Sequence, residues 1–257
     1  MKKKSIWAII PARGGSKSIP KKNIMNIKGY PLIAYSIAAA KLSKKIDRII
    51  VTTDSEEMAE VAKKYGAEAP FIRPAKIAQD RSTDKEFFDH AIAWFKKHEK
   101  KVPDYFVHLR PTTPLRDPKN IAAAIEHMLS HPKANAMRSG HKIEIVPQKF
   151  FGLDGEYFVG LFPDDKRPDY HNMPRQSFAP TYKPDGYVDM LRPSFITKSG
   201  RIHGNRLLAF LTPETVDIDY VSDLMAVKEN IGKQRWAVYD YLKKRFKPTP
   251  LKERLAH

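Results

Sequence analysis

The chain has 257 residues, a formal net charge of +17 and no cysteine, and 42% of its residues are hydrophobic. This length and composition predict one domain with a substantial core over residues 1–257. The lack of cysteine excludes disulfides and cysteine-ligated metals, and it suits the cytoplasm. We expect no membrane span, because no apolar run is long enough, and no signal peptide, because the first apolar run leads straight into a Pro-Ala-Arg-Gly-Gly turn.

The positive charge could serve a nucleic acid, an anionic surface or an anionic small substrate. It is spread over several short clusters rather than gathered in one tail. A protein that binds nucleic acid would carry a basic stripe interleaved with exposed aromatic residues. Phe87, Phe88 and Phe95 instead have the spacing of a helix face that packs on a core. We therefore expect no nucleic-acid partner, and nucleic-acid binding is kept only as a competing hypothesis.

The first chemically informative segment follows the apolar run 6–10, which we predict to be a buried strand. The run ends in a cationic loop that contains Arg13, Gly14, Gly15, Ser16, Lys17, Lys22 and Asn23. Glycines let backbone N–H groups approach phosphate oxygens, and arginine and lysine neutralise their charge. The loop lacks the Gly-Lys-Ser/Thr ending of a P-loop and the G-x-G-x-x-G of a dinucleotide fold. It predicts a polyphosphate site, with a plain solvated turn as the alternative.

Strands and helices alternate through the next hundred residues. We predict strands at 48–54 and 105–109, and helices at 32–42, 56–65, 87–95 and 118–129. Ser55 and Asp117 are placed to cap two of these helices. Such alternation predicts a three-layer α/β fold with a mostly parallel sheet. Ligands of these sheets bind beyond the carboxyl ends of the strands, where the cationic loop, Asp54 and the segment 110–116 should meet.

The second half of the chain breaks this rhythm. Between about 143 and 200, seven prolines preclude long helices, so we expect short strands and extended arms in a small inserted lobe that forms a dimer. A strand at 206–211, a helix from about 222 and a last helix at about 234–246 follow.

Asp217 and Asp219 flank the apolar Ile218. In an extended conformation both carboxylates project to the same side, where they would repel each other unless a hard cation joins them. Mg²⁺ held together with phosphate oxygens satisfies this requirement. The alternative role for Asp219 is to cap the following helix.

Five segments occur in one order along the chain: the cationic loop, Arg73-Pro-Ala with Gln79-Asp80, Pro-Thr-Thr-Pro-Leu-Arg at 111–116, Pro174-Arg175-Gln176, and Asp217-Ile218-Asp219. In this order the chain resembles the CMP-N-acylneuraminate (sialic acid) cytidylyltransferases, from about residue 5 to 230. The resemblance implies a Rossmann-like nucleotidyltransferase fold with a small dimerisation lobe. It also implies a Mg²⁺-dependent, homodimeric enzyme that transfers CMP from CTP to an acidic nine-carbon sugar and releases diphosphate.

The same resemblance assigns residues to roles. Arg13, Gly14, Gly15, Ser16, Lys22 and Asn23 fall in the nucleotide loop, and Arg13, Lys17 and Lys22 are expected to offset the charge of the leaving diphosphate. Arg73 and Asp80 match positions beside the base and the ribose. The expected sugar-binding residues are Arg110, Thr112, Arg175, Gln176, Lys183 and Asp185, and the expected metal ligands are Asp217 and Asp219.

Three of the expected sugar-binding residues depart from the family pattern. Lys183 stands where a second arginine is frequent, Asp185 where asparagine is frequent, and Arg110 where glutamine is common. These departures indicate an acceptor other than ordinary N-acetylneuraminic acid, such as legionaminic acid or an amino-modified ulosonic acid. Two alternatives stay open: a GTP-using legionaminic acid guanylyltransferase, and a cytidylyltransferase for 3-deoxy-octulosonic acid or an amino-modified form of it.

Overall fold

The computed structural model describes residues 3–16 and 18–249. Its centre is a six-stranded sheet with the order β10-β6-β9-β5-β1-β4. The strands are β1 (Ile6–Pro11), β4 (Arg48–Thr52), β5 (Tyr105–His108), β6 (Ala136–Ile143), β9 (Thr181–Leu191) and β10 (Leu207–Leu211). Only β9 runs against its neighbours β5 and β6, and the other pairs are parallel. The predicted mostly parallel sheet is confirmed.

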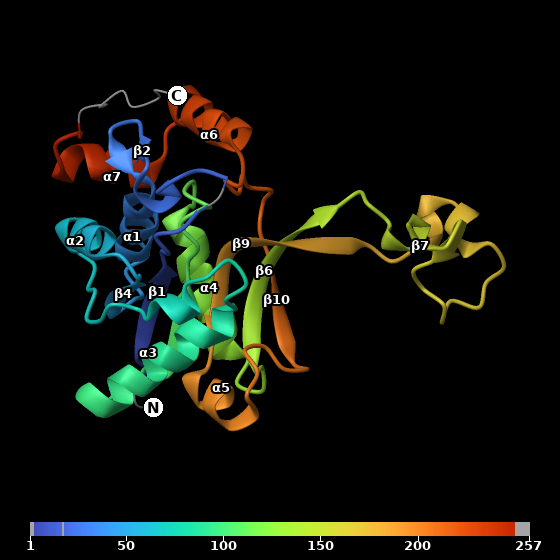
Figure 1. Ribbon diagram of the computed structural model, residues 1–257, viewed down its shortest axis with the longest axis horizontal. Helices are drawn as coiled ribbons and strands as arrows, with labels where there is room; N and C mark the ends of the chain where they lie inside the picture. The colour runs from blue at the N-terminus through green and yellow to red at the C-terminus, as the bar shows by residue number, and fades with distance from the viewer. Residues whose placement is uncertain (1–2, 17, 250–257) are drawn as a thin grey trace.

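Two hydrophobic clusters lie on opposite faces of this sheet, so the fold has three layers (Figure 1). Alternate residues of β1 divide between them: Ile6, Ala8 and Ile10 join one cluster, and Trp7 and Ile9 join the other. The larger cluster includes residues of α1 (Leu32–Leu42), α2 (Glu56–Lys64), α4 (Pro118–Ser130), α6 (Val221–Lys233) and α7 (Ala237–Arg245). The smaller one includes residues of α3 (Asp84–His98) and α5 (Pro193–Ser199).

Local signals fix the helix boundaries as the sequence predicts. The Ser55 side chain accepts a hydrogen bond from the Met58 N–H, and Asp117 accepts one from the Lys119 N–H. Gly66 takes the left-handed backbone (φ 85°) just after α2, which favours glycine there. None of the helices within residues 3–16 and 18–249 combines the length and apolar character needed to cross a bilayer.

Outside the sheet the chain forms short elements. These are the strand pairs β2 (Asn26–Ile27) with β3 (Tyr30–Pro31) and β7 (Phe151–Asp154) with β8 (Tyr157–Gly160), and the 3-10 turns Lys22–Ile24, Ala75–Ile77, Pro147–Lys149, Tyr170–Asn172 and Arg175–Ser177. The β7–β8 hairpin lies on a projection that β6 and β9 carry away from the main body (Figure 1). We call residues 144–180 the projecting lobe.

The expected extent of the inserted lobe, about 143–200, needs correction. Residues 189–191 of β9 pair with β5 in the central sheet, and Ile196 of α5 packs in the smaller core cluster. The sequence concealed this strand because Pro184 lies within it. Pro184 is tolerated because it pairs with Gly140 beside an irregularity of the β6 register, between Arg138 and Gly140.

Candidate active site

A cavity of about 500 Å³ opens beyond the carboxyl ends of β1 and β5, as the fold geometry predicts. Nine of the predicted site residues line it: Arg13, Ser16, Lys22, Asn23, Arg73, Asp80, Arg110, Thr112 and Asp219. They come from four separate segments of the chain. The structure therefore brings together most of the nucleotide loop, the Arg73–Asp80 segment and one of the two aspartates at 217 and 219.

Two neighbouring residues, Arg13 and Gly14, hold the start of the cationic loop in place. The Gly14 N–H donates to Asp54 Oδ1 at 2.7 Å, so this carboxylate at the end of β4 anchors the loop. Arg13 reaches across the cavity mouth, where it donates to the carbonyl oxygen of Gln79 at 2.8 Å and pairs with Asp80 at 3.1 Å. No atom of the described residues lies within 4 Å of a Cβ placed on Gly15, so these residues leave the surface beside it open. The loop presents open backbone and fixed positive charge on one side of the cavity.

Lys22 connects the loop to the segment before α6. Its ammonium donates to the carbonyl oxygen of Ile218 at 2.6 Å and lies 3.4 Å from Asp219 Oδ1. Ile218 itself is buried, and its N–H donates to the carbonyl oxygen of Thr112 at 2.8 Å. The loop, the segment after β5 and the Asp217–Asp219 segment therefore form one hydrogen-bonded unit.

Arg73 is a buried arginine with unused donors. Arg73 is 5% exposed, and its guanidinium lies 5.8 Å from the centre of the Phe87 ring. Its Nε and Nη2 have no hydrogen-bond partner among residues 3–16 and 18–249. Burial lowers the pKa of this guanidinium, and nearby Arg13 also lowers it against the opposing effect of Asp54. Buried polar groups in proteins are normally paired, so these two donors are suited to a ligand in the cavity.

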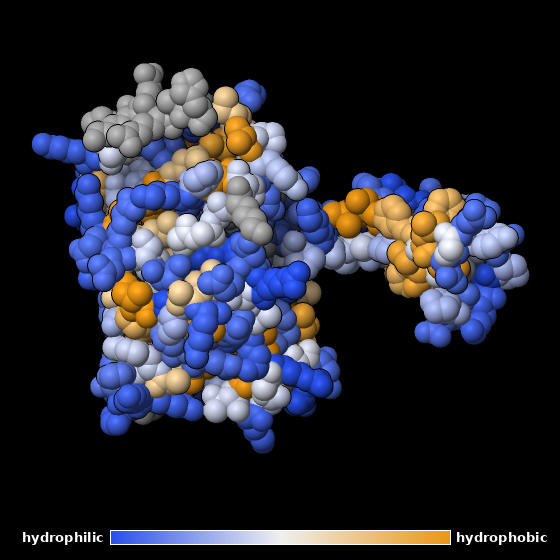
Figure 2. Space-filling view, viewed as in Figure 1, coloured by the Kyte–Doolittle hydropathy of each residue, from blue (hydrophilic) through white to orange (hydrophobic). Residues whose placement is uncertain are grey.

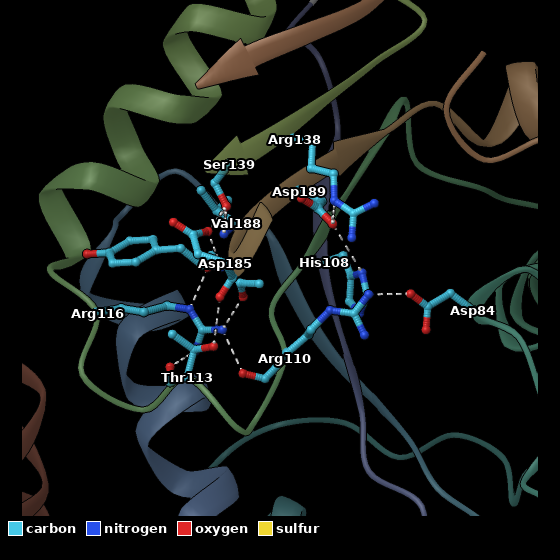
Figure 3. Close-up of polar contacts among 12 residues, drawn as sticks. Asp84, His108, Arg110, Thr113, Arg116, Arg138, Ser139, Asp185, Val188 and Asp189 are labelled. Atoms are coloured by element: carbon cyan, nitrogen blue, oxygen red, sulfur yellow. Dashed lines mark hydrogen bonds and ion pairs between the residues drawn. The ribbon is translucent and has the colours of Figure 1, made fainter. Parts of the chain in front are cut away.

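Arg110 and Asp84 form the far wall of the cavity. Their side chains make a direct ion pair and are each about 30% exposed (Figure 3). Burial raises the pKa of Asp84, but the neighbouring His108 and Arg110 more than offset this effect, so the pKa lies below its usual value. Asp84 therefore stays ionised and holds the Arg110 guanidinium in place.

Several predicted residues do not line the cavity. Gly14 and Gly15 belong to the loop behind its lining, Asp217 is exposed beside it, and Lys17 lies outside the described residues. Arg175 and Gln176 are on the projecting lobe, where Arg175 pairs with Glu144. Lys183 is exposed on the stretch of β9 that leads to the lobe. No residue between 113 and 218 lines this cavity.

Asp185 is used inside the protein rather than in the cavity. It is 4% exposed, and its Oδ1 accepts from Ser139 Oγ at 2.6 Å and from the Tyr187 N–H at 3.0 Å. Its Oδ2 accepts from the Thr212 hydroxyl. Both oxygens thus stabilise the junction of β6, β9 and β10, which places Asp185 outside the expected sugar contact.

The lining also includes ten residues that were not predicted as site residues: Pro11, Ser18, Ile77, Ala78, Gln79, Ser82, Thr83, Asp84, Phe87 and Pro111. Thr83 and Glu86 form a capping box that starts α3, so this helix begins at the cavity. The Ser-Thr-Asp-Lys-Glu pattern at 82–86 was the available signal, because Thr followed by Glu three residues later is typical of a helix start.

The aspartates near the cavity fit a divalent cation that is shared with a substrate. No three His, Cys, Asp or Glu side chains cluster as a metal site within the described part of the chain. Mg²⁺ in phosphate-transferring sites needs fewer, since it takes one or two carboxylates together with phosphate oxygens and water. Asp219 on the lining and exposed Asp217 two residues away provide such a donor set.

Comparison with known proteins shows that the chain is similar to cytidylyltransferases. A family model described as cytidylyltransferase matches residues 7–149. A pseudaminic acid cytidylyltransferase of Campylobacter jejuni is 31% identical over 222 residues, which cover 86% of this chain and 93% of that protein. An N-acylneuraminate cytidylyltransferase of Escherichia coli O18:K1:H7 is 29% identical over 93% of this chain, and the match spans only 56% of that longer protein.

Two further matches bear on substrate and fold. A CMP-N,N'-diacetyllegionaminic acid synthase of Legionella pneumophila is 41% identical over 124 residues, which are 47% of this chain and 52% of that protein. A solved CMP-2-keto-3-deoxy-manno-octonic acid synthetase, complexed with CTP, superposes with a TM-score of 0.65 over 89% of this chain and 99% of its own. At 16% identity this likeness shows the shared Rossmann-like nucleotidyltransferase fold alone.

Proposed function

The chain belongs to the cytidylyltransferase family, and on this premise we propose that it transfers CMP from CTP to an acidic nine-carbon sugar of the sialic, pseudaminic or legionaminic acid type. The observation that carries the proposal is the cavity itself. It joins a cationic glycine loop, two unused arginine donors and an aspartate at the carboxyl ends of parallel strands. This is the combination that a triphosphate and a second substrate require.

The proposed reaction is an in-line displacement at the α-phosphorus of CTP. The anomeric hydroxyl oxygen of the sugar forms a bond to this phosphorus and loses its proton, while the bond from the α-phosphorus to the bridging oxygen breaks. Diphosphate leaves with the electron pair of that bond. Arg13, Lys17 and Lys22 are assigned to the developing negative charge, because positioning and electrostatics dominate phosphoryl transfer. Ser16 and Asn23 complete the loop, Gly14 anchors it through Asp54, and the open backbone at Gly15 admits the phosphates.

We assign Arg73 and Asp80 to the nucleoside end of CTP. Cytidylyltransferases generally use a divalent metal ion, and we assign Mg²⁺ to Asp217 and Asp219, where it would neutralise phosphate charge and acidify the attacking hydroxyl. Lys22 lies beside Asp219 and holds the backbone of Ile218, so it keeps this carboxylate next to the loop.

We assign Arg110 and Thr112 to the sugar end of the cavity. Arg175, Gln176 and Lys183 lie on or near the projecting lobe, away from the cavity lining of their own chain. They can serve a sugar site only if a second copy brings its lobe to this cavity. The proposed homodimer therefore accounts for their position.

The surface of the projecting lobe supports this dimer. Leu153, Tyr157 and Phe158 are 70%, 77% and 74% exposed. Figure 2 shows apolar side chains gathered on the projection, in contrast to the mostly hydrophilic surface of the main body in that view. A small, detached element with this apolar surface is suited to burial against another chain. Sedimentation of the protein at micromolar concentration should give a dimer, and Tyr157→Lys with Phe158→Lys should give a monomer.

The reaction is tested by mass detection of a CMP-sugar and by diphosphate release. We expect diphosphate from CTP and Mg²⁺ only after a sugar acid is added, and loss of at least about 100-fold of this rate in Lys22→Met. Lys21→Met is the matched control, since Lys21 is exposed and pairs with Glu57 away from the cavity. Diphosphate release without a sugar acid would contradict the proposal. We place this chemistry in the cytoplasm, where CTP is supplied.

Two alternatives are not favoured: GTP as the nucleotide donor and 3-deoxy-octulosonic acid as the acceptor. The relatives named above are cytidylyltransferases for N-acylneuraminate and pseudaminic acid and a CMP-N,N'-diacetyllegionaminic acid synthase, and none of these names includes a guanylyl donor. The 3-deoxy-octulosonate enzyme shares the fold at 16% identity, which carries no substrate information.

A further inference from the structure

A row of polar residues crosses the sheet behind the Arg110 wall. Directly opposite residues of neighbouring strands project to the same face. On the face covered by α3, one such row is apolar and consists of Phe106, Leu191 and Ala136. The next row toward the cavity consists of His108 on β5, Asp189 on β9 and Arg138 on β6 (Figure 3). The sheet face thus changes from apolar to charged where the cavity begins.

This row is buried but incompletely hydrogen-bonded. His108 and Asp189 are 2% and 3% exposed. Asp189 Oδ2 lies 3.9 Å from His108 Nδ1 and 3.8 Å from Arg138 Nε, which is beyond hydrogen-bond distance. Within the described residues, Asp189 Oδ1, His108 Nε2 and Arg138 Nε have no hydrogen-bond partner, whereas the backbone N–H of Ser139 donates to the Asp189 carboxylate. Such unpaired groups destabilise a fold unless something else pairs with them. None of the three residues lines the cavity, so their unpaired atoms are available to a ligand group that reaches past Asp84 and Arg110.

Three partly exposed charged side chains surround the two buried ones. The side chains of Asp84, Arg110 and Arg138 are 31%, 29% and 30% exposed. We call these five residues the polar recess, with His108 and Asp189 as its floor and the other three as its rim. Asp84 and Arg110 also line the cavity, so the recess adjoins the end assigned to the sugar.

We propose that the polar recess binds one acylamino substituent of the acidic sugar, with the Asp189 carboxylate accepting from its N–H and Arg138 donating to its carbonyl oxygen. This inference rests on the proposed function and names the part of the sugar that the site reads. The two arginines and two aspartates of the recess balance in formal charge, so a neutral group suits it better than a second carboxylate.

An amide matches the recess better than a hydroxyl does. A hydroxyl carries its donor and acceptor on one oxygen, whereas an amide separates them on N–H and C=O. Asp189 and Arg138 lie opposite each other on adjacent strands, with Cα atoms roughly 5 Å apart. A separated donor and acceptor can pair with both side chains at once.

The charge of Asp189 depends on pH. Burial raises its pKa to about 6, against the opposing effects of Arg138 and Arg110. The other charged or titratable groups that face it are Asp84 on α3, His108 on β5 and His203 on the loop before β10. Burial lowers the pKa of His108 to about 3, so this ring is neutral when Asp189 titrates, and burial also lowers the pKa of His203. Below pH 6, protonation of Asp189 removes an acceptor for the amide N–H.

The test compares pairs of ulosonic acids that differ only by an acylamino group replaced by a hydroxyl. At pH 7.5 the native enzyme should prefer the acylamino sugar in kcat/KM by about 10-fold or more, since a site built for a polar group rejects its analogue. Asp189→Leu should reduce this ratio to less than roughly threefold, with the KM for CTP unchanged and the melting temperature not lowered. Asp189→Asn keeps an acceptor oxygen and should retain part of the preference.

The pH profile separates this role from a structural one. In the native enzyme the acylamino preference should fall as pH drops from 7 to 5, and in Asp189→Asn it should not change. The matched control is Asp104→Asn, the same chemical change just before the amino end of β5.

An unchanged preference in Asp189→Leu would overturn the inference. So would an equal loss for both sugars accompanied by a lower melting temperature. If the native enzyme releases no diphosphate from CTP with any sugar acid, the proposed function fails as well, so the two failures are distinguishable.

Discussion

Two buried arginines differ in what their side chains do: Arg73 lines the cavity, and Arg116 does not. Arg116 is 0% exposed and uses all five of its N–H donors, on Ser36 Oγ and on the carbonyl oxygens of Arg110, Thr113, Gly186 and Tyr187. Arg73 is almost as buried, yet two of its nitrogens have no partner. The satisfied arginine joins the segment after β5 to β9, and the unsatisfied one faces the cavity. Unused hydrogen-bond donors therefore distinguish an arginine that is suited to a ligand from one that holds the fold together.

The largest expected effect is a loss of stability when Arg116 is replaced. Arg116→Met removes five hydrogen bonds and leaves several buried carbonyl oxygens short of a donor, although that of Arg110 still accepts from Thr113 N–H and the Ser36 hydroxyl, so it should lower the free energy of unfolding by roughly 3 kcal/mol or more. Chemical denaturation followed by circular dichroism measures this loss. A variant as stable as the native protein would break the comparison, because the five bonds would then contribute nothing.

The second prediction concerns the proposed metal ligand. Asp219→Ala should lower Mg²⁺-dependent turnover by about 100-fold or more while the fold stays intact, because the ion pair with Lys22 is the one side-chain contact that this exposed carboxylate makes among the described residues. Diphosphate release and the melting temperature are measured together. Full activity in this variant would remove Asp219 from the metal site.

Arg73 should behave in the opposite way to Arg116. Arg73→Met removes two unsatisfied donors, so stability should stay unchanged or rise, while the KM for CTP should increase by about 10-fold. Arg73→Lys restores the charge without the planar fork and should recover only part of the affinity. A large loss of stability in Arg73→Met with an unchanged KM for CTP would show that Arg73 stabilises the fold rather than binding the nucleotide.

Arg110 should control the choice of sugar more than the rate. Arg110→Gln should change the ratio of kcat/KM values between two sugar acids by roughly several-fold, because its guanidinium lines the cavity and is held by Asp84. The KM for CTP serves as the internal control. An unchanged ratio would exclude Arg110 from the sugar contact.

The smallest expected effect is a gain in stability. The pKa of Asp189 is higher in the folded protein than in an unfolded chain, so the folded state binds the extra proton, and stability falls as pH rises from about 4 to 6. Asp189→Asn should therefore be more stable than the native protein above pH 6, by on the order of 1 kcal/mol, and equally stable near pH 4. A variant less stable than the native protein at pH 7.5 would show that the carboxylate supports the fold.

The sequence predicts the parallel part of the fold well. Helix caps at Ser55 and Asp117, and apolar runs such as 6–10, are local signals that the structure confirms. The antiparallel strand β9 was hidden, because Pro184 lies inside it and because it pairs with residues of β5 and β6 that are between 38 and 85 positions away in the sequence.

The sequence predicted site residues correctly where their role does not depend on hydrogen-bond partners from distant parts of the chain. Arg13, Lys22, Arg73 and Asp219 meet in the cavity as expected. Asp185 and Asp189 lie four residues apart on β9, and nothing in their sequence shows that the first is fully hydrogen-bonded and the second is not. That distinction depends on partners from β6, β10 and the segment after β5, which only the fold brings together.

The most direct test of the account is a matrix of the four nucleoside triphosphates against several ulosonic acids, measured as diphosphate release with Mg²⁺. The account predicts release with CTP and with nine-carbon sugar acids that carry acylamino groups, and little release with the other nucleotides. Release with GTP in place of CTP, or with 3-deoxy-octulosonic acid in place of the nine-carbon acids, would contradict it.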